Sequence, residues 1–283
     1  MEVEPALPDE DDGEFNSSAS HGCGFRCSDD DQNDRRSQRR REICWQGCGR
    51  PAAICICPFL PPSPIPTSTR LVVLHHPHEL RGNKLATLPA LSRSLLLFES
   101  VRGRRLRHGC SPLLDSLSLS PSPSSPVLFL FPSLCSSRSA QDLARWAADT
   151  PLAARSEPVL VVFDATWSHA REMVAASLPF LSRFALQVEI GGGCDLGLEG
   201  ASTFESDLVL RKEPWSGCVS TIEAVARALR VLEPDNRGAA IEEMLLAVLR
   251  AMVAFQARHL KPTRPRLRMR KKGQEQGECS PSV

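Results

Sequence analysis

Residues Pro158–His169 read PVLVVFDATWSH. Val159–Phe163 is apolar throughout and rich in valine, which predicts a buried strand. The residues that follow the stretch, Ala170–Ser177, have the composition of a helix. Polar side chains between a buried strand and a helix occupy the usual place of a ligand site in an α/β sheet. A turn that only caps the helix fits the same residues, so this stretch alone leaves both interpretations open.

Strands and helices alternate on both sides of this stretch. Further strands are predicted at 69–75, 127–131, 184–190 and 207–211. Helices are predicted through Leu85–Leu95, at 139–148 with Ser139 as N-cap, from about 217, and from about 238 to 259. Such alternation predicts an α/β fold with a mostly parallel sheet.

The overall charge hides a segregated pattern. The 283 residues include 34 Lys and Arg against 33 Asp and Glu, but 1–34 is acidic whereas 35–41 and 258–272 are basic. Two basic segments favour a nucleic-acid partner. No apolar run reaches the length of a membrane span, and the acidic N-terminus is unlike a secretory signal. We therefore expect a soluble protein of the cytoplasm, the nucleus or both, with no membrane partner.

The composition divides the chain into four segments. Residues 1–41 have few large apolar side chains and are predicted to form a disordered tail, as is the basic segment 261–283. Residues 42–60 form a cysteine-rich element, and 61–260 form the main domain. Within that domain, the Ser/Pro-rich stretch 111–126 predicts a mobile insert.

The cysteine-rich element has the composition of a metal site. Its four thiols, Cys44, Cys48, Cys55 and Cys57, are separated by glycines and a proline that allow tight turns. Four thiolates satisfy a tetrahedral zinc ion and leave no open position, so the metal would be structural. Because the last pair is Cys-x-Cys rather than Cys-x-x-Cys, a small cysteine knot without metal remains an alternative.

Two polar stretches follow other predicted elements. The first strand ends in residues 75–79, HHPHE, where the proline and the spacing keep the histidines off one helical face. This favours a turn that lines a ligand or an RNA phosphate over a metal centre. The basic run 102–107 contains Arg104 and Arg105, and Gly103 allows the backbone to approach a phosphate closely. A solvated loop is the alternative for this run.

Two other enzyme classes each fit a single stretch. Val188–Gly193 is similar to the glycine-rich loop of dinucleotide-fold methyltransferases, but it comes late and no helical pattern follows it. Asp164 after an apolar run is typical of a phosphatase with an aspartyl nucleophile. That chemistry needs a second acid two residues later, where this chain has Thr166.

Several motifs together resemble the DTW-domain family of tRNA-uridine aminocarboxypropyltransferases. The matching motifs are, in order, Cys48-x-Arg50-Pro51, His76-Pro77-x-Glu79, Thr87, Asp164-x-Thr166-Trp167 and Ser220-Thr221-x-Glu223-Ala224. The resemblance covers about residues 42–260. It is closer to the eukaryotic second DTW-domain type, judging by the cysteine-rich prelude and Cys57-Pro-Phe-Leu60. Ala165 departs from the glycine usual in the family, which is tolerable if its φ is negative.

The resemblance implies a fold and a reaction. The fold would be a SPOUT-like α/β domain of a kind that can carry a deep C-terminal knot. The reaction would transfer the 3-amino-3-carboxypropyl group of S-adenosylmethionine to N3 of a tRNA uridine, releasing methylthioadenosine. The alternatives are an RNA methyltransferase that uses S-adenosylmethionine and a non-catalytic, zinc-containing RNA-binding module.

Site residues follow from the motifs and the strand ends. We expect Asp164 to be the general base, with Trp167 stacking on a base, Thr166 beside them, and His169 as the alternative base. Candidates for binding the cofactor are Ser220, Thr221, Glu223, Phe131 and Pro132, where Glu223 has capping-box spacing as well. Candidates for RNA contact are His76, Glu79, Arg104, Arg105, Arg211, Arg268 and Arg270.

Overall fold

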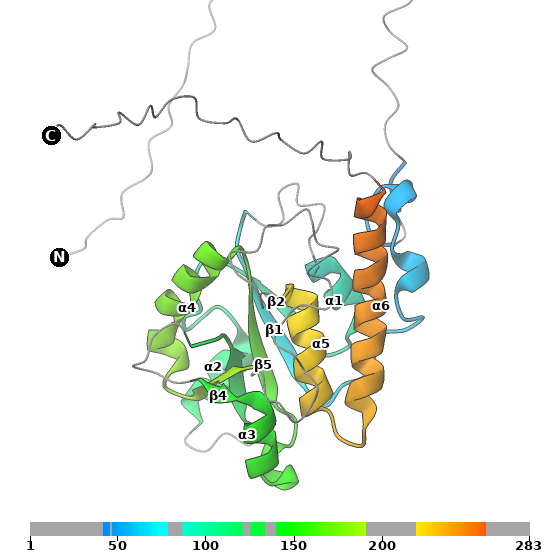
Figure 1. Ribbon diagram of the computed structural model, residues 1–283. Helices are drawn as coiled ribbons and strands as arrows, with labels where there is room; N and C mark the ends of the chain where they lie inside the picture. The colour runs from blue at the N-terminus through cyan, green and yellow to red at the C-terminus, as the bar shows by residue number, and fades with distance from the viewer. Residues whose placement is uncertain are drawn as a thin grey trace, which may run out of the picture. The chain divides into compact units, whose positions relative to one another are not determined.

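A single parallel sheet forms the centre of the fold (Figure 1). The computed structural model describes residues 42–45, 47–78, 87–120, 125–133, 140–190 and 219–258, all within one compact unit. Its six strands are ordered β2-β1-β5-β3-β6-β4, and every neighbouring pair is parallel. The strands are β1 (Arg70–His75), β2 (Phe98–Arg102), β3 (Val127–Leu130), β4 (Gln141–Asp142), β5 (Val159–Asp164) and β6 (Ala185–Glu189). The predicted α/β fold is confirmed.

Helices cover both faces of this sheet. They are α1 (Leu88–Ser94), α2 (Pro112–Leu119), α3 (Leu143–Asp149), α4 (Trp167–Leu181), α5 (Thr221–Leu232) and α6 (Arg237–Ala257). Short 3₁₀ turns lie at Ala52–Ile54, Cys57–Phe59 and Leu152–Arg155. Within the described residues, no helix is both long and apolar enough to cross a lipid bilayer.

Alternation along the strands separates two hydrophobic cores. Leu71 and Val73 of β1 pack with α1, α3, α5 and α6, whereas Val72 and Leu74 pack with α2 and α4. Successive side chains of a strand point to opposite faces, so a strand buried on both faces must be apolar at every position. This explains the unbroken apolar run Val159–Phe163.

Three local predictions differ from the structure. Residues 112–119 of the predicted Ser/Pro-rich insert form α2, because Ser111 caps its N-terminus, Pro112 occupies the first turn and Leu114 is fully buried. The N-cap of α3 is Asp142, whose carboxylate accepts from the Arg145 amide at 2.8 Å, rather than Ser139. The edge strand β2 was not predicted, since only one of its residues is buried.

Some predicted features lie outside the described residues. These are Ser139, the strand 207–211, most of the glycine-rich stretch after Ile190, and both tails. The connection from β6 to α5 is among them, so the knot remains a prediction.

The cysteine-rich element packs on α6. Ile56 is completely buried in the core that α6 helps to form, and the Phe59 ring meets the Phe255 ring edge-on at 6.0 Å. Arg50 also donates a hydrogen bond to the Met252 sulfur at 3.8 Å. The element is therefore part of the same compact unit as the sheet.

The pair α5 and α6 is joined closely at its turn. Gly238 lies directly against the backbone of α5: a Cβ atom there would stand 2.7 Å from both the Arg230 Cα and the Leu229 carbonyl oxygen. Just before this turn, the Glu233 carboxylate accepts hydrogen bonds from the amides of Ser68 and Thr69, each at 2.9 Å. The turn between the helices thus also holds the entry to β1.

Replacing Gly238 by alanine tests this close approach. We expect Gly238→Ala to lower the free energy of unfolding by about 1–3 kcal/mol, the usual cost of overpacking. This would occur although alanine ordinarily favours a helix by about 1 kcal/mol over glycine. Urea unfolding measures the change, with the exposed Ala239→Ser as a control expected to stay within about 0.5 kcal/mol of the parent. A Gly238→Ala protein as stable as the parent would contradict the close packing.

Candidate active site

The register of the sheet gathers the motifs at one edge. His75 at the end of β1 pairs with Asp164 at the end of β5 and with Arg102 at the end of β2. Because the strands are parallel, their carboxyl ends lie at the same edge, which is where ligands bind in open α/β sheets. The helix α4 begins at this edge with Trp167.

Asp164 meets the start of α5. The Thr221 hydroxyl donates a hydrogen bond of 2.6 Å to Asp164 Oδ1, which is short because the acceptor is a carboxylate. Ser220 caps α5 by accepting from the Glu223 amide at 3.4 Å. The partial positive charge of a helix N-terminus favours an ionised carboxylate beside it. Two motifs far apart in the sequence therefore form one site.

The Asp164–Trp167 turn leads into α4 without a side-chain cap. Thr166 occupies the N-cap position of α4, yet its side chain makes no capping hydrogen bond and lies 3.1 Å from His169 Nδ1 instead. Ala165 is not among the non-glycine residues with positive φ, so alanine replaces the family's glycine without strain. A helix cap made by the Thr166 side chain is therefore not present, and the ligand site at this turn stays a prediction.

Phe131 supports the Trp167 ring. Their ring centroids are 5.8 Å apart, and Phe131 also meets Phe163 edge-on at 6.4 Å. Phe131 is buried and its carbonyl accepts from Gln187 at 3.0 Å, whereas Trp167 is only half-buried. Trp167 is the more exposed of the two aromatic side chains and is therefore the one that a ligand could contact, while Phe131 packs against it. Pro132 follows Phe131 at the same strand end.

Three histidines form a cluster of nearly parallel rings. The His76 ring lies 4.2 Å from His169 at 11° and 5.2 Å from His78 at 21°. The backbone amide of His76 donates to the Asp164 carbonyl at 3.0 Å, which places this cluster beside the acid. His78 was not among the predicted site residues, but it lies in the predicted turn at the end of β1, and its amide donates to His76 Nδ1 at 3.4 Å. The neighbouring His75 is buried, and burial lowers its pKa.

Glu223 is engaged inside the protein. Its side chain is completely buried and accepts a 2.9 Å hydrogen bond from Arg227, one turn further along α5. This buried contact gives the Glu223 side chain a structural partner within α5, and its binding to the cofactor stays a prediction. Among the RNA-contact candidates, Arg104 and Arg105 are exposed in the segment that follows β2. Glu79, Arg211, Arg268 and Arg270 lie outside the described residues.

The four cysteines converge as a metal site requires. The sulfur atoms lie within 4.8 Å of one another, with Cys44–Cys57 at 3.6 Å and Cys48–Cys55 at 3.8 Å. A disulfide would bring two sulfurs to about 2.05 Å, whereas a tetrahedron with bonds of about 2.3 Å separates them by about 3.8 Å. A Cβ atom on Gly47 would collide with the sulfurs of Cys57 and Cys44. The cluster could therefore bind a metal.

The surroundings shift the pKa values of Cys48 and Cys55 in opposite directions. Burial opposes ionisation of Cys48, but hydrogen bonds from the backbone of Ile56 and Arg50 and from neighbouring thiols outweigh it and lower its pKa to about 7. For Cys55, a backbone hydrogen bond from Cys57 favours the thiolate, yet burial and the surrounding thiols together raise its pKa to about 12. A bound divalent cation would stabilise all four thiolates together.

Comparisons with known proteins agree with this arrangement. A family model described as DTW domain matches residues 41–257. The chain is 43% identical over 247 residues to tRNA-uridine aminocarboxypropyltransferase A of Arabidopsis thaliana, covering 85% of this chain and 90% of that protein. It is 31% identical over 240 residues to tRNA-uridine aminocarboxypropyltransferase 2 of Macaca fascicularis, covering 82% and 71%. No solved structure matches the chain significantly. With its DTW motif at the carboxyl end of β5, the chain belongs to the DTW-domain family.

Proposed function

We propose that the protein transfers a 3-amino-3-carboxypropyl group from S-adenosylmethionine to N3 of a uridine in tRNA. The observation that carries this proposal is the hydrogen bond from Thr221 to Asp164, which joins two family motifs beside Trp167. The relatives named above are tRNA-uridine aminocarboxypropyltransferases, and they cover most of this chain.

The proposed reaction needs one proton acceptor. S-adenosylmethionine would supply the group on a sulfonium sulfur, which makes the attached γ-carbon electrophilic. As N3 bonds to that carbon, the carbon–sulfur bond breaks with its electron pair, and methylthioadenosine leaves. The N3 proton must go to a base, because uridine N3 is a poor nucleophile until it loses that proton. Asp164 accepts it in this proposal.

Neighbouring residues position the Asp164 carboxylate and the uracil ring from which it takes the proton. Thr221 holds one carboxylate oxygen of Asp164, so the hydroxyl serves the acid rather than an external carboxylate. The half-buried Trp167, backed by Phe131, offers an indole face on which the uracil or the adenine stacks. Ser220 caps the Glu223 amide, and the amides before it at the start of α5 suit an anionic group of the cofactor. These residues fit a donor molecule that has an aromatic ring and a carboxylate.

We further propose that the four cysteines hold a structural zinc ion. All four are soft donors at tetrahedral spacing, and four protein ligands would leave no position for substrate. The ion would fix the element that packs on α6, away from the proton transfer at Asp164.

Labelled cofactor tests the reaction class. S-adenosylmethionine labelled either in its methyl carbon or in its aminobutyrate carbons is incubated with the protein and unmodified tRNA. We expect only the aminobutyrate label in the RNA, since the γ-carbon is the one attacked. Methyl label in the RNA would show a methyltransferase, and tight tRNA binding without any label would show a non-catalytic binding module.

Substitution of Asp164 tests the base. Asp164→Asn should lower the single-turnover rate of transfer by about 10²–10⁴-fold, the usual contribution of a general base. Binding of tRNA should stay nearly unchanged, because asparagine still accepts from Thr221. The matched variant His169→Gln should retain more activity than Asp164→Asn. The reverse order would assign the base to His169.

Metal content tests the cysteine site. We expect about one zinc ion per chain by elemental analysis, with substoichiometric zinc in Cys48→Ser and in Gly47→Ala, whose new methyl group collides with the ligand sulfurs. Cys110→Ser is the matched control, because Cys110 lies outside the cluster and its loss should leave zinc unchanged. Folded parent protein without stoichiometric metal would refute the zinc site.

A further inference from the structure

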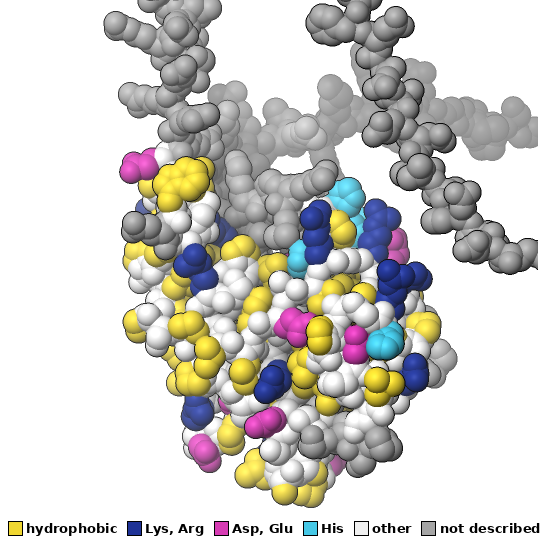
Figure 2. All heavy atoms as spheres, turned by 180° about the vertical axis from the view of Figure 1, so that it is seen from behind, with side chains coloured by type: hydrophobic (Ala, Val, Ile, Leu, Met, Phe, Trp, Pro, Cys, Tyr) yellow, Lys and Arg dark blue, Asp and Glu magenta, His cyan; other side chains and the backbone are white. Residues whose placement is uncertain are grey.

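The segment that joins β2 to α2 carries an unusual concentration of exposed positive charge. Arg102, Arg104, Arg105 and Arg107 are all exposed, and His108 follows them. Among the described residues, no carboxylate forms an ion pair with the guanidinium groups of Arg104, Arg105 and Arg107. Figure 2 shows Lys, Arg and His side chains gathered along one side of the face that it presents. Unpaired arginines on a surface suit a partner that brings its own negative charge.

The segment is held in place although its charges face the solvent. At its start, the Gly103 amide donates to the His75 carbonyl at 3.1 Å. In its middle, the Leu106 side chain is buried in the core, and the Leu106 amide donates to Ser177 of α4 at 2.9 Å. These contacts fix the backbone on both sides of Arg104 and Arg105.

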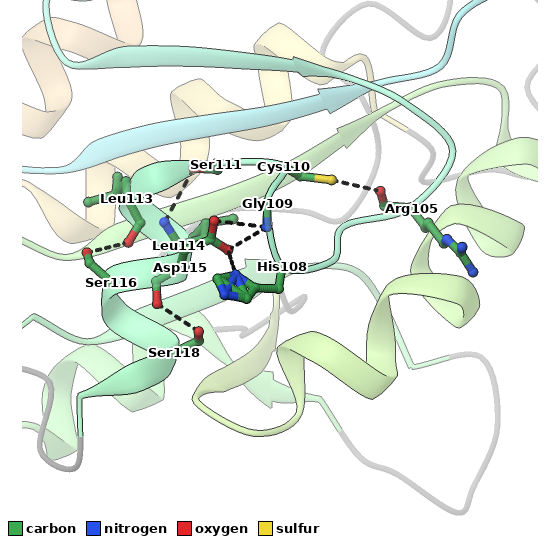
Figure 3. A network of polar contacts seen from close by, with 10 residues as sticks. All are labelled: Arg105, His108, Gly109, Cys110, Ser111, Leu113, Leu114, Asp115, Ser116 and Ser118. Carbon is green, nitrogen blue, oxygen red and sulfur yellow. Dashed lines mark hydrogen bonds and ion pairs between the residues drawn. The ribbon is translucent and has the colours of Figure 1, made fainter. Parts of the chain in front are cut away.

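Asp115 of α2 holds the end of the segment (Figure 3). Its two carboxylate oxygens accept from the Gly109 amide at 2.9 and 3.1 Å, and one of them lies 3.1 Å from His108 Nδ1. The Arg105 side chain points away from this network in Figure 3. The acid therefore shapes the backbone without neutralising the arginines. This also explains why α2 forms where a mobile insert was expected.

The segment begins at the same edge of the sheet as Asp164, and by Leu106 it has reached Ser177, ten residues along α4 from Trp167. Arg102 and Asp164 both pair with His75, from opposite sides, so two strand spacings separate their Cα atoms, or roughly 10 Å. An RNA whose uridine reaches Asp164 would therefore pass close to the start of this segment, from which its backbone would continue along the following arginines. RNA is the polyanion that this placement favours.

We propose that residues 102–109 are a preformed docking surface for the phosphate backbone of the RNA substrate. Asp115 fixes the backbone at the C-terminal end of this surface. This proposal rests on the proposed function for the identity of the RNA. It extends beyond Arg104 and Arg105 to Arg107, His108 and Asp115, and it assigns a role to α2. Because the backbone of this surface is ordered before the RNA binds, less conformational entropy is lost on binding.

Charge removal on full-length protein tests the surface. The triple variant Arg104→Gln/Arg105→Gln/Arg107→Gln should bind unmodified tRNA at least about tenfold more weakly at low salt. The slope of log affinity against log salt should become shallower by about 2–3, since each lost phosphate contact removes about 0.7–0.9. The matched control Arg70→Gln/Arg93→Gln/Arg183→Gln removes three exposed arginines at the opposite edge of the sheet. Equal losses in the two triple variants would overturn the proposal.

The variant Asp115→Asn distinguishes the effect of the backbone conformation of this surface from the effect of its net charge. Removing an acid near a phosphate would tighten binding if only net charge mattered. If the hydrogen bonds of Asp115 hold the backbone that carries the arginines, tRNA binding should weaken by about two- to fivefold, because the arginines are no longer preorganised. Unchanged or tighter tRNA binding would refute this role of Asp115. These measurements report tRNA binding and do not depend on the transfer assay. Wild-type protein that binds tRNA without transferring the group would therefore refute only the proposed reaction.

Discussion

One hydrogen bond, from the Thr221 hydroxyl to the Asp164 carboxylate, connects the parts of this protein that matter for chemistry. Asp164 belongs to the central strand β5, and Thr221 is the first residue of α5. For the two to meet, α5 must lie on the sheet with its N-terminus at the carboxyl edge. The packing of α5 against α6, down to the close approach at Gly238, holds it there.

The parallel sheet distributes other roles around this contact. The ends of β1 and β2 bring the histidines and the start of the basic segment to the same edge, on the side of Asp164 opposite to β3. The end of β3 brings Phe131 behind Trp167. In the proposed function, proton transfer, base stacking and phosphate docking would thus fall to different strand ends of one sheet. The cysteine-rich element packs on α6 and stabilises the framework from outside this edge.

Much of this arrangement was predictable from the sequence, because its signals are local. The apolar run before Asp164, the Ser220 cap and the grouped cysteines each act within a few residues, and each was confirmed in the described structure. Long-range contacts were not predictable, because the ring contact of His76 with His169 and the hydrogen bond from Leu106 to Ser177 depend on which surfaces meet. The Glu223–Arg227 pair has the i,i+4 spacing of a helical ion pair, a local signal that was overlooked. The exposed edge strand β2 lacked a periodic apolar pattern altogether.

The most direct test is a double-mutant cycle on the single-turnover rate of group transfer. It compares Thr221→Val, Asp164→Ala and the variant that carries both substitutions. If Thr221 acts through Asp164, the double variant will transfer the group no more slowly than Asp164→Ala alone, since groups that act as a unit are not additive. If the two losses multiply instead, Thr221 has a separate function and the account of this contact is wrong.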